Sequence, residues 1–232
     1  MILGRGSSPR GLFLKLPAPQ IVEMAALARF DFVVVDLEHS ALTDADCISL
    51  LRVARLAGIP ALVRLPSVDR GAINRYLEEG AVGIQLASVT RVDEVVALRA
   101  ATRMAPSGRR SVSTTNAMSL FGALSLADYV SVAADSPPIL VVQIETAHTV
   151  DPVASIIGAG ADVVFIGSVD LTVSLDFDAN EIRERERAIR EAAVGEGALL
   201  GGMAGADTAW DYTIVGSDLS VLQTALRSVT RV

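Results

Sequence analysis

The chain has 232 residues, of which 51% are hydrophobic and 20% charged, and this balance excludes a disordered protein. Its formal net charge of −7 and the lack of a basic stripe with interleaved aromatic residues argue against nucleic-acid binding. No apolar run reaches the ~18 residues that a membrane span needs, and secretion is not expected, because no basic segment followed by an apolar stretch stands at the start.

Eight apolar segments predict β-strands, because they are rich in β-branched residues and end at turn-forming or charged residues. In chain order they are Gly11–Leu16, Phe32–Asp36, Ala61–Arg64, Gly83–Leu86, Ile139–Ile144, Val163–Ile166, Ala198–Met203 and Tyr212–Val215. The helical patterns between and after them are Gln20–Ala28, Thr43 or Asp44 to Ala57, Asp69–Glu79, Arg91–Arg103, Leu126–Ala134, Asp151–Gly158, Asn180–Val194 and Asp218–Val229. Residues 1–10 are expected to be poorly ordered, and Met104–Pro138 is long enough to be a lid or an interface arm.

Eight strand–helix units with no linker, composition break or close internal repeat predict a single (β/α)₈ TIM barrel over residues 1–232. A doubly wound sheet is the alternative, but no Gly-x-Gly-x-x-Gly motif follows the first strand. In a barrel the active site lies at the carboxyl ends of the strands.

Two residue counts restrict the chemistry available there. Cys47 is the only cysteine, so no intrachain disulfide forms, which fits a cytoplasmic protein. It lies among apolar residues in a helical pattern and is interpreted as a buried spectator. Lys15 is the only lysine, so a Schiff-base mechanism would depend on this one residue near the N-terminus.

Two strand ends carry carboxylates, Glu145 after strand five and Asp170 after strand six. Carboxylates are rarely buried unless they are paired or bound to a cation, so the pair predicts a metal site with oxygen ligands. Water would fill the remaining positions, as Mg²⁺ and Mn²⁺ prefer, while Co²⁺ and Zn²⁺ stay open. The alternative is that each residue caps the helix that follows.

Other strand ends carry His39, Arg64, Gln85 and Gln143. Arg64 offers donors for a carboxylate or an enolate oxygen, or alternatively forms an ion pair with Asp36. His39 is a candidate for proton transfer, or alternatively a hydrogen-bonded loop residue. Gln85 is expected to be structural. Asp36 and Glu38 are interpreted as supporting carboxylates rather than metal ligands.

Five segments, in this order and spacing, carry a resemblance to a known family: Phe30–His39, Val63–Arg64, Ala105–Arg110, Gln143–Thr146 and Phe165–Leu171. The chain resembles the HpcH/HpaI aldolases, which are metal-dependent class II pyruvate aldolases related to the citrate lyase β-subunit. The resemblance implies that Glu145 and Asp170 are metal ligands and that Arg64 contacts the keto or enolate oxygen of pyruvate. It implies that His39 is the acid/base group and that Glu78 orients it.

The resemblance also implies that Gln143 lines the pyruvate pocket and that the backbone N–H groups of Ser168, Val169 and Asp170 hold the pyruvate carboxylate. It implies a homo-oligomer, a trimer or hexamer, in which the last helix swaps between subunits. The family often has Gly-Pro-x-Asp where this chain has Gly167-Ser168-Val169-Asp170, so the departure leaves substrate preference open.

Together these features predict a cytoplasmic aldolase that cleaves or forms 4-hydroxy-2-oxo acids, yielding pyruvate and an aldehyde through a metal-stabilised pyruvate enolate. One alternative is an acyl-CoA lyase of the citrate lyase β-subunit or malyl-CoA type. Another is a catalytically idle binding barrel. Neither a nucleic acid nor a membrane is an expected partner.

Overall fold

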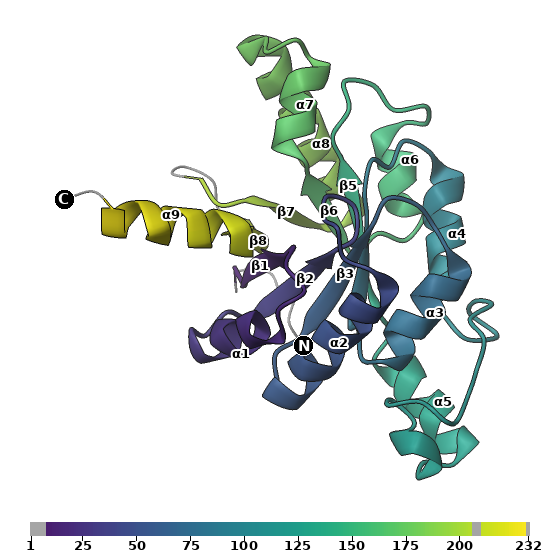
Figure 1. Cartoon of the computed structure of the whole chain (residues 1–232). Helices are drawn as coiled ribbons and strands as arrows, with labels where there is room; N and C mark the ends of the chain where they lie inside the picture. Colours follow the sequence, from purple (N-terminus) through teal and green to yellow (C-terminus); the bar gives the residue numbers. More distant parts are fainter. Residues whose placement is uncertain (1–7, 206–209, 231–232) are drawn as a thin grey trace.

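Eight parallel strands form a closed barrel in the computed structural model, which describes residues 8–205 and 210–230 (Figure 1). The strands are β1 (Arg10–Leu14), β2 (Phe32–Asp36), β3 (Ala61–Leu65), β4 (Gly83–Leu86), β5 (Ile139–Ile144), β6 (Val163–Ile166), β7 (Leu199–Met203) and β8 (Tyr212–Ser217). Each strand pairs with the next along the chain, and β8 pairs with β1. The predicted TIM barrel is therefore confirmed.

Within the described residues, one or more helices follow every strand except β7, and most of them lie around the barrel. They are α1 (Pro19–Leu27), α2 (Asp44–Ala57), α3 (Arg70–Glu78), α4 (Val92–Thr102), α5 (Leu126–Asp135), α6 (Val153–Gly158), α7 (Ser168–Ser174), α8 (Ala179–Glu196) and α9 (Asp218–Thr230), with a 3₁₀ turn at Leu120–Gly122. Local signals fix their ends: Thr43 makes a capping box with Asp46, and Gly58 ends α2 at φ 72°. None of the helices described is long and apolar enough to cross a membrane.

Side chains alternate along each strand, so every second residue points into the barrel. On β2, Phe32 and Val34 join an apolar cluster inside the barrel, whereas Val33 and Val35 pack outward in the core beneath the helices. Phe32 stacks on Tyr212 inside the barrel, with 4.6 Å between ring centroids. Asp36 is the next inward residue on β2, beyond this apolar cluster. Polar residues therefore meet at the carboxyl end.

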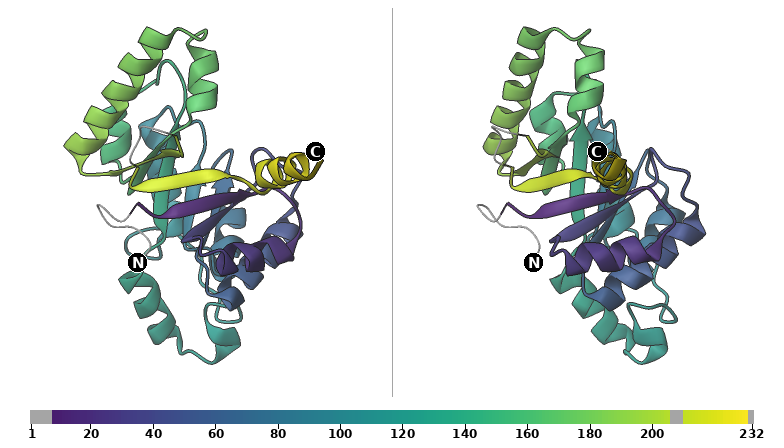
Figure 2. Two further views of the ribbon diagram at one scale, coloured as in Figure 1. Left: turned by 90° about the vertical axis from the view of Figure 1, so that its left-hand side faces the viewer. Right: turned by 60° about the vertical axis from the view of Figure 1, so that its left-hand side comes forward.

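Two parts of the fold differ from the sequence predictions. Arg10 was expected to be poorly ordered, but it is the first residue of β1, and its amide donates to Asp31 Oδ2 at 2.8 Å. Residues 1–7, for which poor order was also expected, lie outside the described residues. Helix α7 was not predicted, because its seven residues carry no side-chain cap. The predicted final helix is present as α9, which extends away from its own barrel (Figure 2).

Candidate active site

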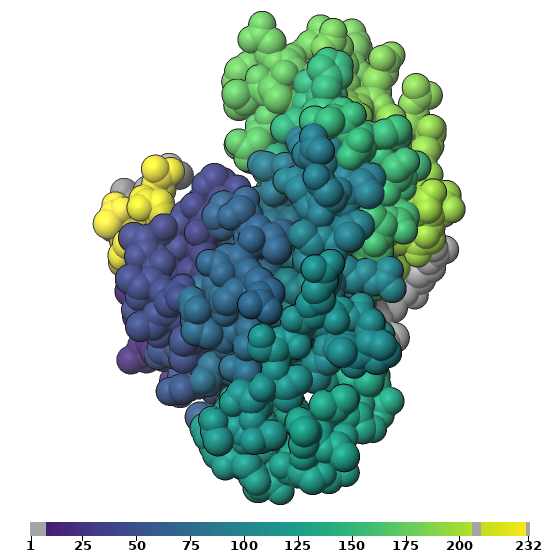
Figure 3. All heavy atoms as spheres, turned by 90° about the vertical axis from the view of Figure 1, so that its right-hand side faces the viewer, coloured from purple at the N-terminus to yellow at the C-terminus, as the bar shows by residue number. Residues whose placement is uncertain are grey.

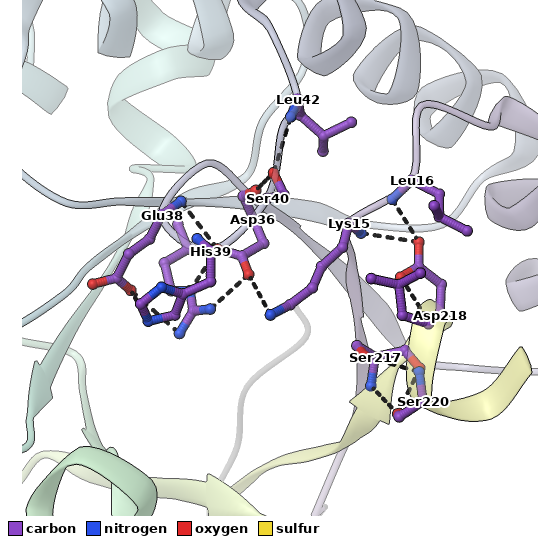
Figure 4. A network of polar contacts seen from close by, with 12 residues as sticks. Lys15, Leu16, Asp36, Glu38, His39, Ser40, Leu42, Ser217, Asp218 and Ser220 are labelled. Atoms are coloured by element: carbon purple, nitrogen blue, oxygen red, sulfur yellow. Dashed lines mark hydrogen bonds and ion pairs between the residues drawn. The ribbon is translucent and has the colours of Figure 1, made fainter. Parts of the chain in front are cut away.

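Asp36, the last residue of β2, is the centre of the polar cluster at the carboxyl end (Figure 4). Its fully buried carboxylate accepts hydrogen bonds from Arg64 Nε at 2.9 Å and Nη2 at 2.6 Å. The Lys15 Nζ atom lies 3.3 Å from Asp36 Oδ2, and the amides of Glu38 and His39 each donate to Oδ1 at 3.1 Å. Burial alone would raise the pKa of Asp36, but Arg64 and the two amides hold it below its usual value.

Arg64, on β3, therefore forms an ion pair with Asp36. This ion pair was the predicted alternative to a contact with substrate. The Nη1 atom of Arg64 also lies 3.4 Å from Glu38 Oε2, and its guanidinium lies 4.3 Å above the ring of Phe13. Because Asp36 uses two of the five guanidinium N–H donors, a substrate oxygen has to use the others. The ion pair fixes the direction in which those donors point.

Glu38 and His39 follow β2 and face each other, with 3.7 Å between Glu38 Oε2 and His39 Nε2. The imidazole is half exposed, whereas Glu38 Oε2 is buried and accepts no hydrogen bond in the described part of the chain. Burial raises the pKa of Glu38, Arg64 opposes the shift, and the charge of Glu145 adds to it. Glu38 and Glu145 are therefore close enough to repel each other, which brings Glu38 into the site itself.

Glu145 directly follows β5 and is almost completely buried. Its Oε2 atom accepts a hydrogen bond from Gln143 Nε2, and its Oε1 atom accepts one from Ser88 Oγ. Gln85 Nε2 donates to Gln143 Oε1 at 2.6 Å, and the Tyr212 hydroxyl donates to Gln85 Oε1 at 3.2 Å. This relay of neutral side chains runs from β8 across the barrel interior to the Glu145 carboxylate.

Ser88 and Tyr212 are site residues that the sequence reasoning missed. Burial raises the pKa of Tyr212, so its hydroxyl remains a protonated donor at neutral pH. Its inward position at the start of β8 was the available signal. Ser88 lies in the loop after β4 at φ 50°, and nothing in the residue pattern marks it.

Gly167 and α7 bring Asp170 to the same mouth of the barrel. A Cβ atom at Gly167 would lie 2.3 Å from Glu145 Oε2 and 2.7 Å from Glu145 Cβ, so only glycine leaves room for this carboxylate. Asp170 follows in the first turn of α7 and is exposed. No group of three or more Asp, Glu, His or Cys side chains in the described ranges could hold a metal. A cation here would therefore have two carboxylate ligands, with water completing its coordination.

Within one chain, Glu78 does not lie beside His39. It ends α3 five residues before β4 begins, which puts it near the amino ends of the strands, because a helix of this fold runs back against the strand before it. Its carboxylate accepts from Asn74 Nδ2 at 3.3 Å. The acid beside His39 in the same chain is Glu38.

The sequence matches the family model described as HpcH/HpaI aldolase/citrate lyase over residues 10–207. The chain belongs to this family. Membership makes it a carbon–carbon lyase, in agreement with the predicted aldolase activity.

Individual relatives agree with this assignment. The chain is 31% identical to the 5-keto-4-deoxy-D-glucarate aldolase of Enterobacter sp. (strain 638), over 94% of this chain and 90% of that protein. It is 30% identical to a pyruvate aldolase of Rhizobium etli, over 95% and 91%. The crystal structure of an HpcH/HpaI aldolase from Desulfitobacterium hafniense superposes with a TM-score of 0.87 at 27% identity, covering 98% and 94% of the two chains.

Proposed function

We propose that the chain is a divalent-metal-dependent aldolase that cleaves a 4-hydroxy-2-oxo acid into pyruvate and an aldehyde, or forms the acid from them. Mg²⁺ or Mn²⁺ is the proposed cation, with Co²⁺ or Zn²⁺ as alternatives, because the donor set consists of carboxylate oxygens. A similar protein named pyruvate aldolase supports the choice of pyruvate.

The observation that carries this proposal is the uncompensated charge of Glu145. Both oxygens of this buried carboxylate accept hydrogen bonds from neutral donors, and no Lys, Arg or His of the described residues forms an ion pair with it. The charge of Glu38 adds repulsion instead of compensation. A buried carboxylate without a positive partner is unfavourable. A divalent cation held by Glu145 and Asp170 would remove that cost.

When bound, the cation supplies Lewis-acid polarisation of the substrate keto oxygen. The side chains of this chain have complementary tasks. Arg64, held by Asp36, directs its free donors at the enolate oxygen. His39 moves the proton at the substrate hydroxyl, and the Glu38 carboxylate lies 3.7 Å from its Nε2 atom. Gln143 lines the pocket and orients the Glu145 carboxylate.

The amides of Ser168, Val169 and Asp170 are proposed to bind the pyruvate carboxylate. They lie in the first turn of α7, where backbone N–H groups have no acceptor within the helix. This assignment uses backbone atoms, so it does not depend on the missing proline of the family motif.

We further propose a cytoplasmic homo-oligomer, a trimer or hexamer, in which α9 packs on another copy. Every residue of α9 after Asp218 that the structure describes is exposed, including Leu219, Leu222 and Leu226. An apolar helix face of this kind is stabilised by burial against a second surface.

Deuterium exchange at C3 of pyruvate in D₂O, followed by NMR, tests the proposal without knowledge of the aldehyde. We expect exchange that requires Mn²⁺ or Mg²⁺ and that the Glu145→Gln variant lacks. Exchange that persists after chelation, or that is unchanged in this variant, would overturn the metal-dependent mechanism. Exchange into acetyl-CoA in place of pyruvate would instead establish the acyl-CoA lyase.

A further inference from the structure

A cavity of about 710 Å³ lies at the amino end of the barrel, opposite the candidate active site. We call it the amino-end cavity. The barrel and the arm that carries α5 both contribute to its mostly apolar lining, which includes Val82, Ile139, Leu199, Met118, Tyr129 and Val132. Figure 3 shows this arm in teal at the lower end of the molecule, far from α7 and α8 in green at the upper end. The cavity is therefore separate from the site at the carboxyl end.

Two arginines in the wall of the cavity have only neutral partners. Arg110, whose side chain is buried, donates from Nε to Asn74 Oδ1 at 3.2 Å and from Nη2 to the Tyr129 hydroxyl at 3.3 Å. Arg103 donates from Nη1 to the Pro138 carbonyl at 2.5 Å. Neither guanidinium forms an ion pair with a carboxylate of the described residues. Both also line a second cavity of about 250 Å³, so they lie between two hollow regions.

These two arginines differ from Arg64, whose buried charge is matched by two carboxylates. Burial lowers the pKa of both Arg103 and Arg110, which reflects the cost of holding their charges away from water. A guanidinium stays protonated under such conditions, so a bound anion that pairs directly with it would relieve the cost. The amide N–H of Arg110 donates to the Arg103 carbonyl at 2.8 Å, which keeps the two residues together.

The other charges of the wall limit the kind of anion. Asp135 and Asp162 also line the cavity, and the charge of Asp162 acts on Arg103. Glu78 acts on Arg110 in the same way. These carboxylates would repel a phosphate or a dicarboxylate, whereas a single carboxylate matches the guanidinium fork. The apolar remainder of the wall favours a hydrocarbon body.

We propose that the amino-end cavity binds a small amphipathic monocarboxylate, with its carboxylate on Arg110 and Arg103 and its hydrocarbon body against the apolar wall. This site is independent of the aldolase reaction and uses none of its residues. The ligand class is a medium-length aliphatic or aromatic monocarboxylic acid.

Calorimetric titration of the full-length protein with hexanoate, hexan-1-ol and hexylammonium tests the proposal, in excess pyruvate so that the active site is occupied. We expect hexanoate to bind at least about tenfold more tightly than the alcohol, because a charged hydrogen bond is added, and hexylammonium not to bind. Equal binding of acid and alcohol would show that the arginines play no part. Absence of hexanoate binding would overturn the site altogether.

The Arg110→Leu variant is expected to weaken hexanoate binding at least about tenfold, whereas Arg52→Leu leaves it unchanged. Arg52 is the matched control, because it is an exposed arginine that is paired with Glu79 and does not line the cavity. Equal hexanoate affinity in the two variants would refute the assignment of Arg110. The comparison of the three probes on the wild-type protein decides the question even where Arg110→Leu does not fold.

Discussion

Replacement of Gly167 by alanine tests the packing around the proposed metal ligand. The added Cβ would lie 2.3 Å from Glu145 Oε2 and 2.7 Å from Glu145 Cβ, both well inside van der Waals contact. Rotation of the Glu145 carboxylate relieves only the first overlap, because the Cβ atom of Glu145 is fixed to the backbone at the end of β5. Either β5 or the start of α7 has to move, and Glu145 turns away from Asp170.

Overpacking of this kind costs about 1–3 kcal/mol in the free energy of unfolding. Urea unfolding of the metal-free protein, followed by the fluorescence of Trp210, measures that loss. Displacement of a metal ligand by a neighbouring change typically weakens metal affinity about 10–100-fold. Calorimetric titration with Mn²⁺ therefore provides the second readout, and pyruvate C3 exchange should fall in parallel.

Gly195→Ala is the matched control, because an added Cβ at this exposed position in α8 meets no atom within 4 Å. Its stability should be unchanged or rise by up to about 1 kcal/mol, and its Mn²⁺ affinity should equal that of the wild type. If Gly167→Ala behaves like Gly195→Ala in both measurements, Glu145 does not occupy the position on which the metal-site argument rests.

Three further predictions concern Asp36, Glu38 and helix α9. Asp36→Asn removes the closer of the two carboxylates that pair with the buried Arg64, and it should lower the free energy of unfolding by about 3–5 kcal/mol in urea titrations. The exposed Asp93→Asn should have no measurable effect. Folding raises the pKa of Glu38, so its ionised form destabilises the folded protein above that pKa. Glu38→Gln should therefore be more stable than the wild type at pH 7, and the difference should vanish towards pH ~4. Lower stability of the variant at pH 7 would contradict the predicted direction of the effect. Leu226→Asp on α9 should reduce the mass of the assembly in light scattering while circular dichroism shows the barrel intact, and an unchanged mass would exclude α9 from the subunit interface.

Most of the barrel could be predicted because its signals are local. Apolar runs such as Phe32–Asp36 are read from neighbouring residues, and Thr43 and Gly58 mark the ends of α2 within a few positions of the chain. The short α7 escaped prediction because it lacks a capping side chain. The place of Glu78 near the amino ends of the strands could not be predicted, because the resemblance gives residue roles without the direction in which α3 runs.

The sequence by itself determined which side chains stand at the strand ends, since the two-residue alternation continues the inward series through Asp36, Arg64, Gln143 and Glu145. It could not determine their partners. That Arg64 pairs with Asp36, and that Tyr212 donates into the relay to Glu145, depends on the register of neighbouring strands and on the closure of β8 against β1. These contacts join residues far apart in the chain, and register is set by the packing of the whole barrel.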